Sequence, residues 1–151
     1  MFIAGCAAGE ADTGTPGTPA PVAAAAPAPA PAPTAAAPAA AGGAATIWDG
    51  VYTAEQAGRG EEVASAVCFA CHSESEWTRP LFLGAWNGRP VAGLWQLIED
   101  TMPYDSPGGL TDQEYTDVVS YMLELNGVPA GTTELPVDRA ALATISFAAR
   151  P

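Results

Sequence analysis

Three residues that can bond to a porphyrin or its iron lie within five positions, in the segment Cys68-Phe69-Ala70-Cys71-His72. Two thiols at this spacing can reach the two vinyl groups on one edge of a haem, and the adjacent imidazole is then placed to coordinate the iron. Cys-x-x-Cys-His is the attachment motif of c-type haem. The segment therefore predicts one covalent haem c, held by Cys68 and Cys71, with His72 as an axial ligand of the iron.

Three other interpretations of the same residues have less support. A structural zinc site needs four ligands, but the third cysteine is the distant Cys6 and the chain has a single histidine. A thioredoxin-like dithiol belongs to a strand-helix context, whereas helical periodicity surrounds this motif. A chance match in a structural helix would leave two thiols without a role. Haem attachment is the favoured interpretation.

The second axial ligand is expected from a methionine, because a thioether opposite a histidine is common in electron transfer and raises the reduction potential. Met102, in Thr101-Met102-Pro103, follows a short helical stretch at 91–98 and opens a loop rich in Pro and Gly. Met122 is the competitor, but it lies in a helical pattern in which methionine is more often core. We expect Met102 to be the ligand, and the single histidine excludes bis-histidine ligation.

From about Thr46 onward, the order of attachment helix, ligand loop, Met-Pro and closing helix resembles the class I, mono-haem cytochromes c. Within that family the chain is most similar to the cytochrome domains associated with quinoprotein alcohol dehydrogenases. That similarity rests on Trp48-Asp49-Gly50-Val51-Tyr52-Thr53, Trp86-Asn87-Gly88-Arg89-Pro90 and Thr101-Met102-Pro103. The resemblance implies a small all-α fold of three to five helices around one covalent haem.

The resemblance also implies roles for residues outside the haem motif. Gly60, eight positions before Cys68, would let the closing helix cross closely, and Tyr121 would be the aromatic residue at that crossing. The Pro80 carbonyl is a candidate partner for the second nitrogen of His72. Trp86 and Arg89 are candidates for contacting the haem propionates, against the alternative of ordinary packing and a solvated charge.

Capping signals place the two main helices. Thr53 is the expected N-cap of a helix that reaches Val67, despite two glycines within it. Thr111 with Glu114 forms a capping-box pattern, and the helix that it begins is expected to end at Asn126-Gly127.

The tail is expected to pack back on the domain. A short helical run from Ala140 to Ile145 is predicted there, with Leu142, Ile145 and Phe147 as the packing residues.

The N-terminal third differs in composition from the rest. Residues 1–6 are interpreted as the remnant of a signal segment, because Ile3-Ala4-Gly5-Cys6 resembles the lipobox of bacterial lipoproteins; Cys6 would then be lipidated. The leader is incomplete, so the true start is expected upstream. The alternative is a free cysteine at a frayed terminus. Residues 7–45, rich in Ala and Pro, predict a disordered tether, and 46–151 form the cytochrome c domain.

Charge limits the partners of this domain. Residues 46–151 contain fifteen acidic residues against five arginines and no lysine, a net charge of −10. Nucleic acid is not expected as a partner, because binding phosphates requires a basic surface. The acidic balance indicates either solubility or docking on a basic patch of a redox protein.

An iron with both axial positions filled offers no site for substrate, so the sequence predicts an electron carrier and not an enzyme. Haem is attached to c-type cytochromes outside the cytoplasmic membrane, so the resemblance implies a periplasmic or extracytoplasmic, lipid-anchored protein. It would serve a respiratory, photosynthetic or dehydrogenase chain, as a mobile shuttle or as a subunit. The alternative function is a haem-based sensor or binding protein in which a small ligand displaces Met102.

Overall fold

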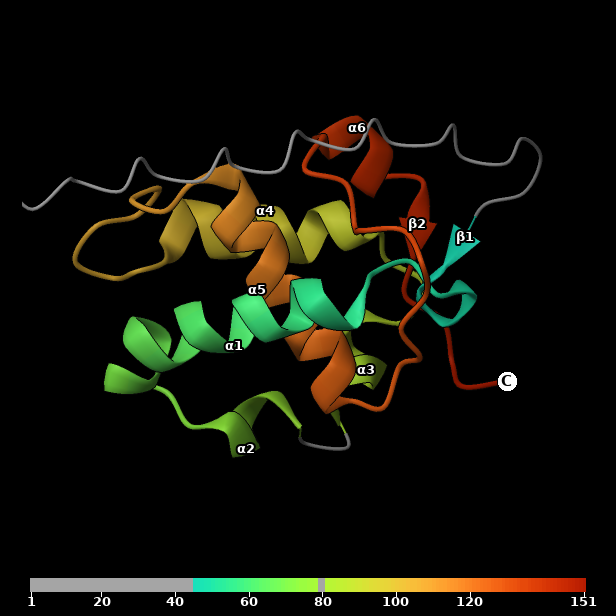
Figure 1. The fold of residues 1–151 in the computed structure, drawn as a ribbon, viewed down its shortest axis with the longest axis horizontal. Helices are drawn as coiled ribbons and strands as arrows, with labels where there is room; N and C mark the ends of the chain where they lie inside the picture. The colour runs from blue at the N-terminus through green and yellow to red at the C-terminus, as the bar shows by residue number, and fades with distance from the viewer. Residues whose placement is uncertain (1–44, 79–80) are drawn as a thin grey trace, which may run out of the picture. The chain divides into compact units, whose positions relative to one another are not determined.

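The computed structural model describes residues 45–78 and 81–151. Its helices are α1 (Ala54–Ala66), α2 (Glu74–Trp77), α3 (Leu81–Trp86), α4 (Val91–Thr101), α5 (Asp112–Leu125) and α6 (Arg139–Leu142) (Figure 1). Two 3-10 turns, η1 (Ile47–Asp49) and η2 (Cys68–Ala70), and two short strands, β1 (Ala45–Thr46) and β2 (Ile145–Ser146), complete these segments. The predicted small all-α fold is confirmed.

The number of helices differs from the expected three to five. The described segments hold six α-helices, and the excess comes from α2 and α6, each of four residues, and α3, of six residues. The long helices α1, α4 and α5 are the ones that the sequence pattern predicts. The lipobox, Cys6, residues 7–44 of the predicted tether and Pro80 lie outside the described residues, so those predictions stay predictions. Ala45, the last residue assigned to the tether, belongs to strand β1 instead.

Both long terminal helices begin at the predicted caps. The Thr53 hydroxyl accepts a hydrogen bond from the Gln56 N–H at 3.1 Å and starts α1. At α5, the Thr111 hydroxyl accepts from the Glu114 N–H at 3.2 Å, while the Glu114 carboxylate accepts from the Thr111 N–H at 2.7 Å. These reciprocal bonds satisfy backbone donors that a helix leaves free at its N-terminus.

Helices α1 and α5 cross with their backbones in contact at Gly60. A Cβ atom at this position would overlap the Asp117 carbonyl and would lie 2.9 Å from the Tyr121 Cβ. Gly58, one half-turn earlier, has nothing within 4 Å of such an atom. The predicted crossing at Gly60 and Tyr121 is confirmed, and only glycine permits it.

An ion pair reinforces the crossing. The Arg59 guanidinium, on α1, donates to both carboxylate oxygens of the buried Asp117, on α5, at 2.9 and 3.1 Å. The same guanidinium reaches Glu134 at 2.9 Å. Arg59 thus joins α1, α5 and the segment that follows α5.

That following segment is bound to the start of α1. The buried Gln56 side-chain amide donates to the Leu135 carbonyl at 3.0 Å and accepts from the Leu135 N–H at 2.7 Å. The Tyr52 hydroxyl donates to the Val128 carbonyl at 2.6 Å. The chain after α5 is therefore held by side chains that satisfy its backbone groups, without forming a sheet there.

The tail corrects one prediction. The expected helix over 140–145 is wrong in its extent: α6 ends at Leu142, and Ile145–Ser146 forms β2, which pairs in parallel with β1 at Ala45–Thr46. The partner strand lies about 100 residues away along the chain, so no local pattern could reveal it. Leu142, Ile145 and Phe147 are buried, as expected.

In the described segments, every helix is too short or too polar to cross a membrane.

Candidate functional site

A cavity of about 720 Å³ lies among the end of α1, the turn η2, helix α4, the loop after α4 and helix α5. Its walls are mostly apolar, with α4 contributing Leu94, Leu97 and Ile98 and α5 contributing Val118 and Met122. This volume is in the range of cofactor pockets, about 300–1,000 Å³.

The haem motif forms one wall of the cavity. Cys68, Cys71 and His72 all line it, and neither cysteine is in a disulfide. The N–H groups of Cys71 and His72 both donate to the Cys68 carbonyl, at 3.1 and 2.9 Å, so the motif is folded into a tight turn. Burial raises the pKa of the half-buried Cys68 thiol, because desolvation disfavours the thiolate. The structure brings together the three residues that the sequence singled out.

The imidazole of His72 has two close neighbours, Glu76 and Trp77. Its Nδ1 atom lies 3.1 Å from a carboxylate oxygen of Glu76, one turn further on, and its ring centroid lies 6.2 Å from that of Trp77. The bonds from His72 and from Ser73 lower the pKa of Glu76. With Nδ1 donating to a carboxylate, Nε2 is the nitrogen left to coordinate a metal. Sequence reasoning missed Glu76 as a partner of His72.

Both candidate methionine ligands line the cavity. Met102 caps the C-terminus of α4, where its N–H donates to the Ile98 carbonyl at 2.8 Å, and its side chain is half-buried. Met122 comes from the middle of α5 and is 5% exposed. The sequence favoured Met102, which opens the loop after α4; the choice between the two methionines stays a prediction.

Trp86 and Arg89, the two candidates for contacting the propionates, differ in their position relative to the cavity. Trp86, buried at 7% exposure, lines the cavity and packs on Phe147 with ring centroids 5.9 Å apart. The Arg89 guanidinium carbon lies 4.2 Å from the Trp86 ring centroid. The cavity wall includes Trp86 but not Arg89, which lies against the Trp86 ring. Contact of either residue with a propionate stays a prediction.

Tyr115 is a site residue that the sequence analysis did not single out. Its hydroxyl donates to the Met102 carbonyl at 2.7 Å and accepts from the Leu110 N–H at 3.4 Å. A signal was present: Tyr115, Val118 and Met122 share one helix face, and a buried tyrosine hydroxyl needs a partner.

These residues fit a covalently attached haem. The wall carries two thiols and an imidazole within five consecutive residues, thioether sulfurs come from α5 and from the end of α4, and the rest of the lining is predominantly apolar. Thiols for attachment, N and S ligands for iron and a dry surround are the donor set that c-type haem uses.

The fold is small and all-α, and its cavity carries the donor set of a c-type haem site. Residues 55–122, somewhat less than half of the chain, match the family model described as cytochrome c oxidase, cbb3-type, subunit III. The match supports a cytochrome c, which implies covalently bound haem c, and the small size is consistent with a single haem. Comparison with curated proteins and with solved structures gave no match.

Proposed function

We propose that this chain is a mono-haem c-type cytochrome that passes single electrons between redox proteins. One observation carries the proposal: Cys68, Cys71, His72 and Met102 all line the same largely apolar cavity. When bound there, haem c supplies reversible one-electron chemistry at iron.

The chain's own residues have separate roles in this proposal. Cys68 and Cys71 would hold the haem covalently, His72 and Met102 would bind its iron, and Glu76 holds the His72 ring through Nδ1. The apolar side chains of α4 and α5 exclude water, which limits the solvent reorganisation that electron transfer requires. With both ligands bound, the iron would offer no place for a substrate, and the domain would act as a carrier.

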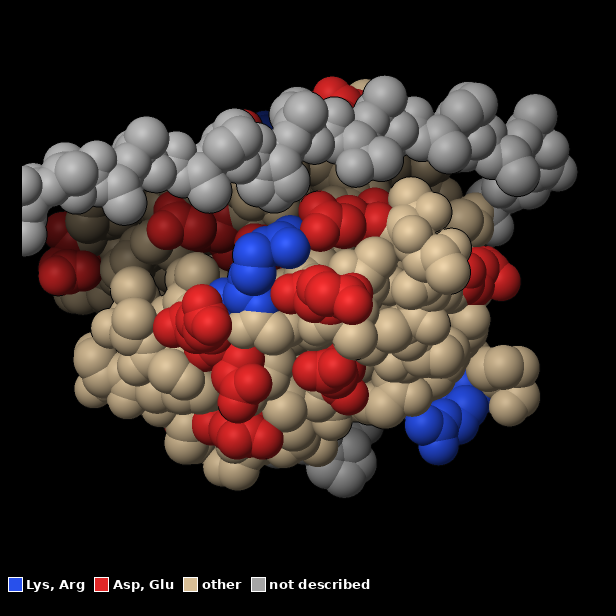
Figure 2. Space-filling view, viewed as in Figure 1, with Lys and Arg blue, Asp and Glu red and all other residues tan. Residues whose placement is uncertain are grey.

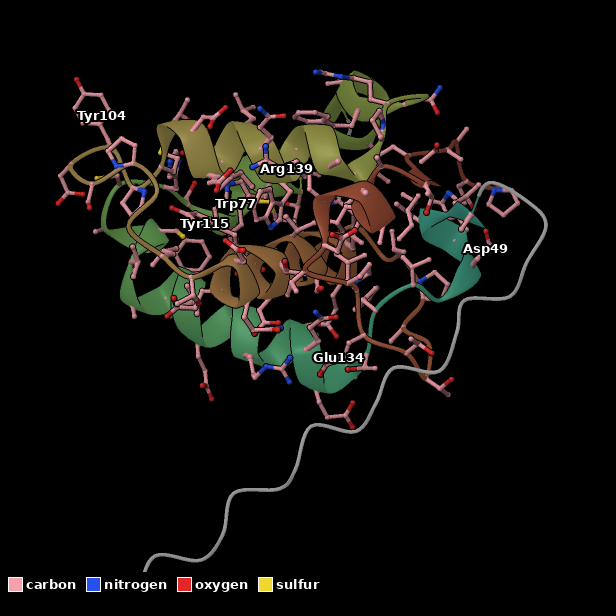
Figure 3. All side chains as sticks on the ribbon, turned by 90° about the horizontal axis from the view of Figure 1, so that it is seen from above. Asp49, Trp77, Tyr104, Tyr115, Glu134 and Arg139 are labelled. Carbon is pink, nitrogen blue, oxygen red and sulfur yellow. The ribbon has the colours of Figure 1, made fainter. Side chains whose placement is uncertain are left out.

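The mouth of the cavity supports docking of a redox protein. Leu97 and Tyr104, which line the cavity, are 51% and 87% exposed, and Tyr104 projects from the molecule (Figure 3). Asp100 and Asp105 are both exposed and lie close to Leu97 and Tyr104 in the chain. A small apolar contact with acidic neighbours favours a transient partner with a basic patch. The donor and acceptor would belong to a respiratory, photosynthetic or dehydrogenase chain.

Export and anchoring belong to the same proposal. Haem attachment outside the cytoplasmic membrane and the lipobox-like Ile3-Ala4-Gly5-Cys6 support a lipid on Cys6 at the extracytoplasmic face of a bacterial membrane. Cys6→Ser should move the protein from the membrane to the soluble fraction. A salt wash removes protein that is held on the membrane only by a charged partner. Cys6→Ser protein that stays on the membrane after this wash would contradict a lipid anchor.

The first experiment measures mass and spectrum of the purified full chain. We expect the added mass of one haem, lost in a Cys68→Ser/Cys71→Ser variant, and a single reversible one-electron titration. Colourless protein without the added mass would overturn the proposal.

Ligation is tested by Met102→Ala. We expect this variant to keep the covalent haem but to lose the weak long-wavelength band that a thioether ligand gives to ferric haem. Retention of that band would assign the ligand to Met122 instead. Rapid carbon monoxide binding by the unaltered reduced protein would favour a small-ligand sensor over a carrier.

A further inference from the structure

Tyr115 lies where the ligand loop meets α5. It is the fourth residue of that helix, is 1% exposed, and packs edge-on against Trp95 of α4 with ring centroids 6.0 Å apart and planes at 75°. Figure 3 shows Tyr115 at the start of α5, beside the loop from which Tyr104 projects.

One hydroxyl joins the two ends of the loop between α4 and α5. It donates to the carbonyl of Met102, the residue that caps α4, and accepts from the N–H of Leu110, just before the Thr111 cap of α5. Within the loop, the Gly108 N–H donates to the Glu99 carbonyl at 2.9 Å. The hydroxyl is thus the side-chain group that ties the Met102 backbone to α5.

The ring that carries this hydroxyl is itself fixed. The indole N–H of Trp95 donates to the Thr116 hydroxyl at 3.0 Å, and that hydroxyl donates to the Asp112 carbonyl at 2.7 Å. Trp95 therefore links α4 to α5 at the residue that follows Tyr115. A buried ring with this support can hold a backbone group in one position.

A competing thioether lies on the same helix. Met122 is seven residues, or two turns, beyond Tyr115 and lines the same cavity. Any loosening of the Met102 backbone therefore favours either an exchange of methionines or an open coordination position. Fixing that backbone decides which sulfur is presented.

We propose that Tyr115 is a positioning residue, which selects Met102 as the axial ligand by holding the Met102 carbonyl. This inference rests on the proposed His72/Met102 ligation. Tyr115 lines the cavity, and its hydroxyl is bonded to the peptide that carries the ligand, so it acts on the ligand through that peptide. Without the Tyr115 hydroxyl, the fraction of molecules in which Met102 is not bound to iron rises. An external ligand then binds more tightly in proportion to that fraction.

The test uses Tyr115→Phe with Tyr52→Phe as the matched control. Each substitution removes one buried hydroxyl that donates to a backbone carbonyl, at 2.7 and 2.6 Å, but Tyr52 is bonded to Val128 and does not line the cavity. Both are made in the full, haem-loaded chain and again in a Met122→Leu background, which removes the only other methionine of the described segments. The readouts are carbon monoxide affinity of the reduced protein, the ferric thioether band and the reduction potential.

In the Met122→Leu background, we expect Tyr115→Phe to weaken the thioether band and to raise carbon monoxide affinity by about two- to tenfold, the equilibrium effect of one hydrogen bond. Tyr52→Phe should match its parent in all three readouts. Equal changes in both tyrosine variants, or none in Tyr115→Phe, would overturn the inference. A missing thioether band in the unaltered protein would instead reject the proposed ligation itself, before any variant is compared.

Discussion

The side chain of Gly60 is a single hydrogen atom, and this allows α1 and α5 to approach closely. Any larger side chain would overlap the Asp117 carbonyl, a backbone group that cannot rotate away. The crossing therefore depends on the residue type at one position, while the neighbouring glycine in the same helix faces open space.

We predict that Gly60→Ala lowers the free energy of unfolding by about 1–3 kcal/mol, the usual cost of overpacking. Gly58→Ala is the control and should leave that free energy unchanged or raise it by up to about 1 kcal/mol, because alanine favours the helix. Denaturant unfolding of the haem-loaded protein measures both. Equal effects of the two substitutions would show that helix propensity, not the crossing, governs position 60.

Gln56 makes a second contact that depends on residue type. We predict that Gln56→Leu destabilises the domain by about 2–5 kcal/mol, because the buried N–H and carbonyl of Leu135 both lose their partner and each such loss costs about 1–3 kcal/mol. Gln96→Leu, at an exposed position of α4, serves as the control and should change stability little. A small effect of Gln56→Leu would mean that water reaches the Leu135 backbone.

At the scale of the elements, α5 begins with a cap that titrates. The Thr111 N–H and hydroxyl, both bonded to the Glu114 carboxylate, lower the pKa of Glu114 from its ordinary 4.5. A carboxyl whose pKa is lower in the folded state contributes stability that is present above the unfolded pKa and is lost as the pH falls through the folded value.

The acid dependence of stability should therefore contain a contribution from this cap. We predict that the free energy of unfolding of the unaltered protein falls more steeply below pH 4.5 than that of Glu114→Gln, which keeps a capping side chain but does not titrate. Unfolding measured at a series of pH values from neutral to acidic gives both curves. Parallel curves would exclude the cap as a source of acid sensitivity.

Elements with local signals were predictable from the sequence. The caps at Thr53 and Thr111, with the apolar periodicity that follows them, located α1 and α5 because both signals lie within a few residues. The short helices α2 and α3 carry no comparable signal, since one or two turns need tertiary support. The residues of strand β2 continue a helical pattern, and they form a strand because of β1, which is remote in sequence.

The candidate site divides in the same way. Cys68, Cys71 and His72 could be predicted because attachment and ligation are encoded in five consecutive residues. The bond from Tyr115 to Met102 joins residues thirteen positions apart across a loop, and its existence depends on how α4 packs on α5. Glu76, whose carboxylate contacts His72, is only four residues further along the chain. The contact could be predicted only by knowing that a helical turn joins the two residues.

At the scale of the whole molecule, the positive side chains are paired with nearby groups. Each arginine in the described ranges contacts an acidic side chain or a tryptophan ring, as Arg59, Arg89, Arg139 and Arg150 do. Acidic side chains dominate the face over α1 in Figure 2, where Glu55, Glu61 and Glu62 are exposed. The surface field is therefore negative, in line with the net charge of −12 of the chain.

This field should control the rate of electron transfer to small charged oxidants. We predict that oxidation of the reduced protein by a tris-phenanthroline cobalt(III) cation slows by roughly tenfold or more as ionic strength rises from low to high, and that oxidation by ferricyanide accelerates. Stopped-flow kinetics measure both. Asp100→Asn/Asp105→Asn should reduce the salt dependence more than Glu55→Gln, which lies at the opposite end of α1 from the cavity. The same salt response with both oxidants would refute steering by charge.

The pairing of β1 with β2 fixes where the preceding chain joins the domain. Residue 45 lies among the strands, at the end of the domain opposite Tyr104 and the loop after α4 (Figures 1 and 3). The chain therefore enters the domain far from the rim of the cavity, so whatever precedes Ala45 is attached away from the surface that we propose for docking.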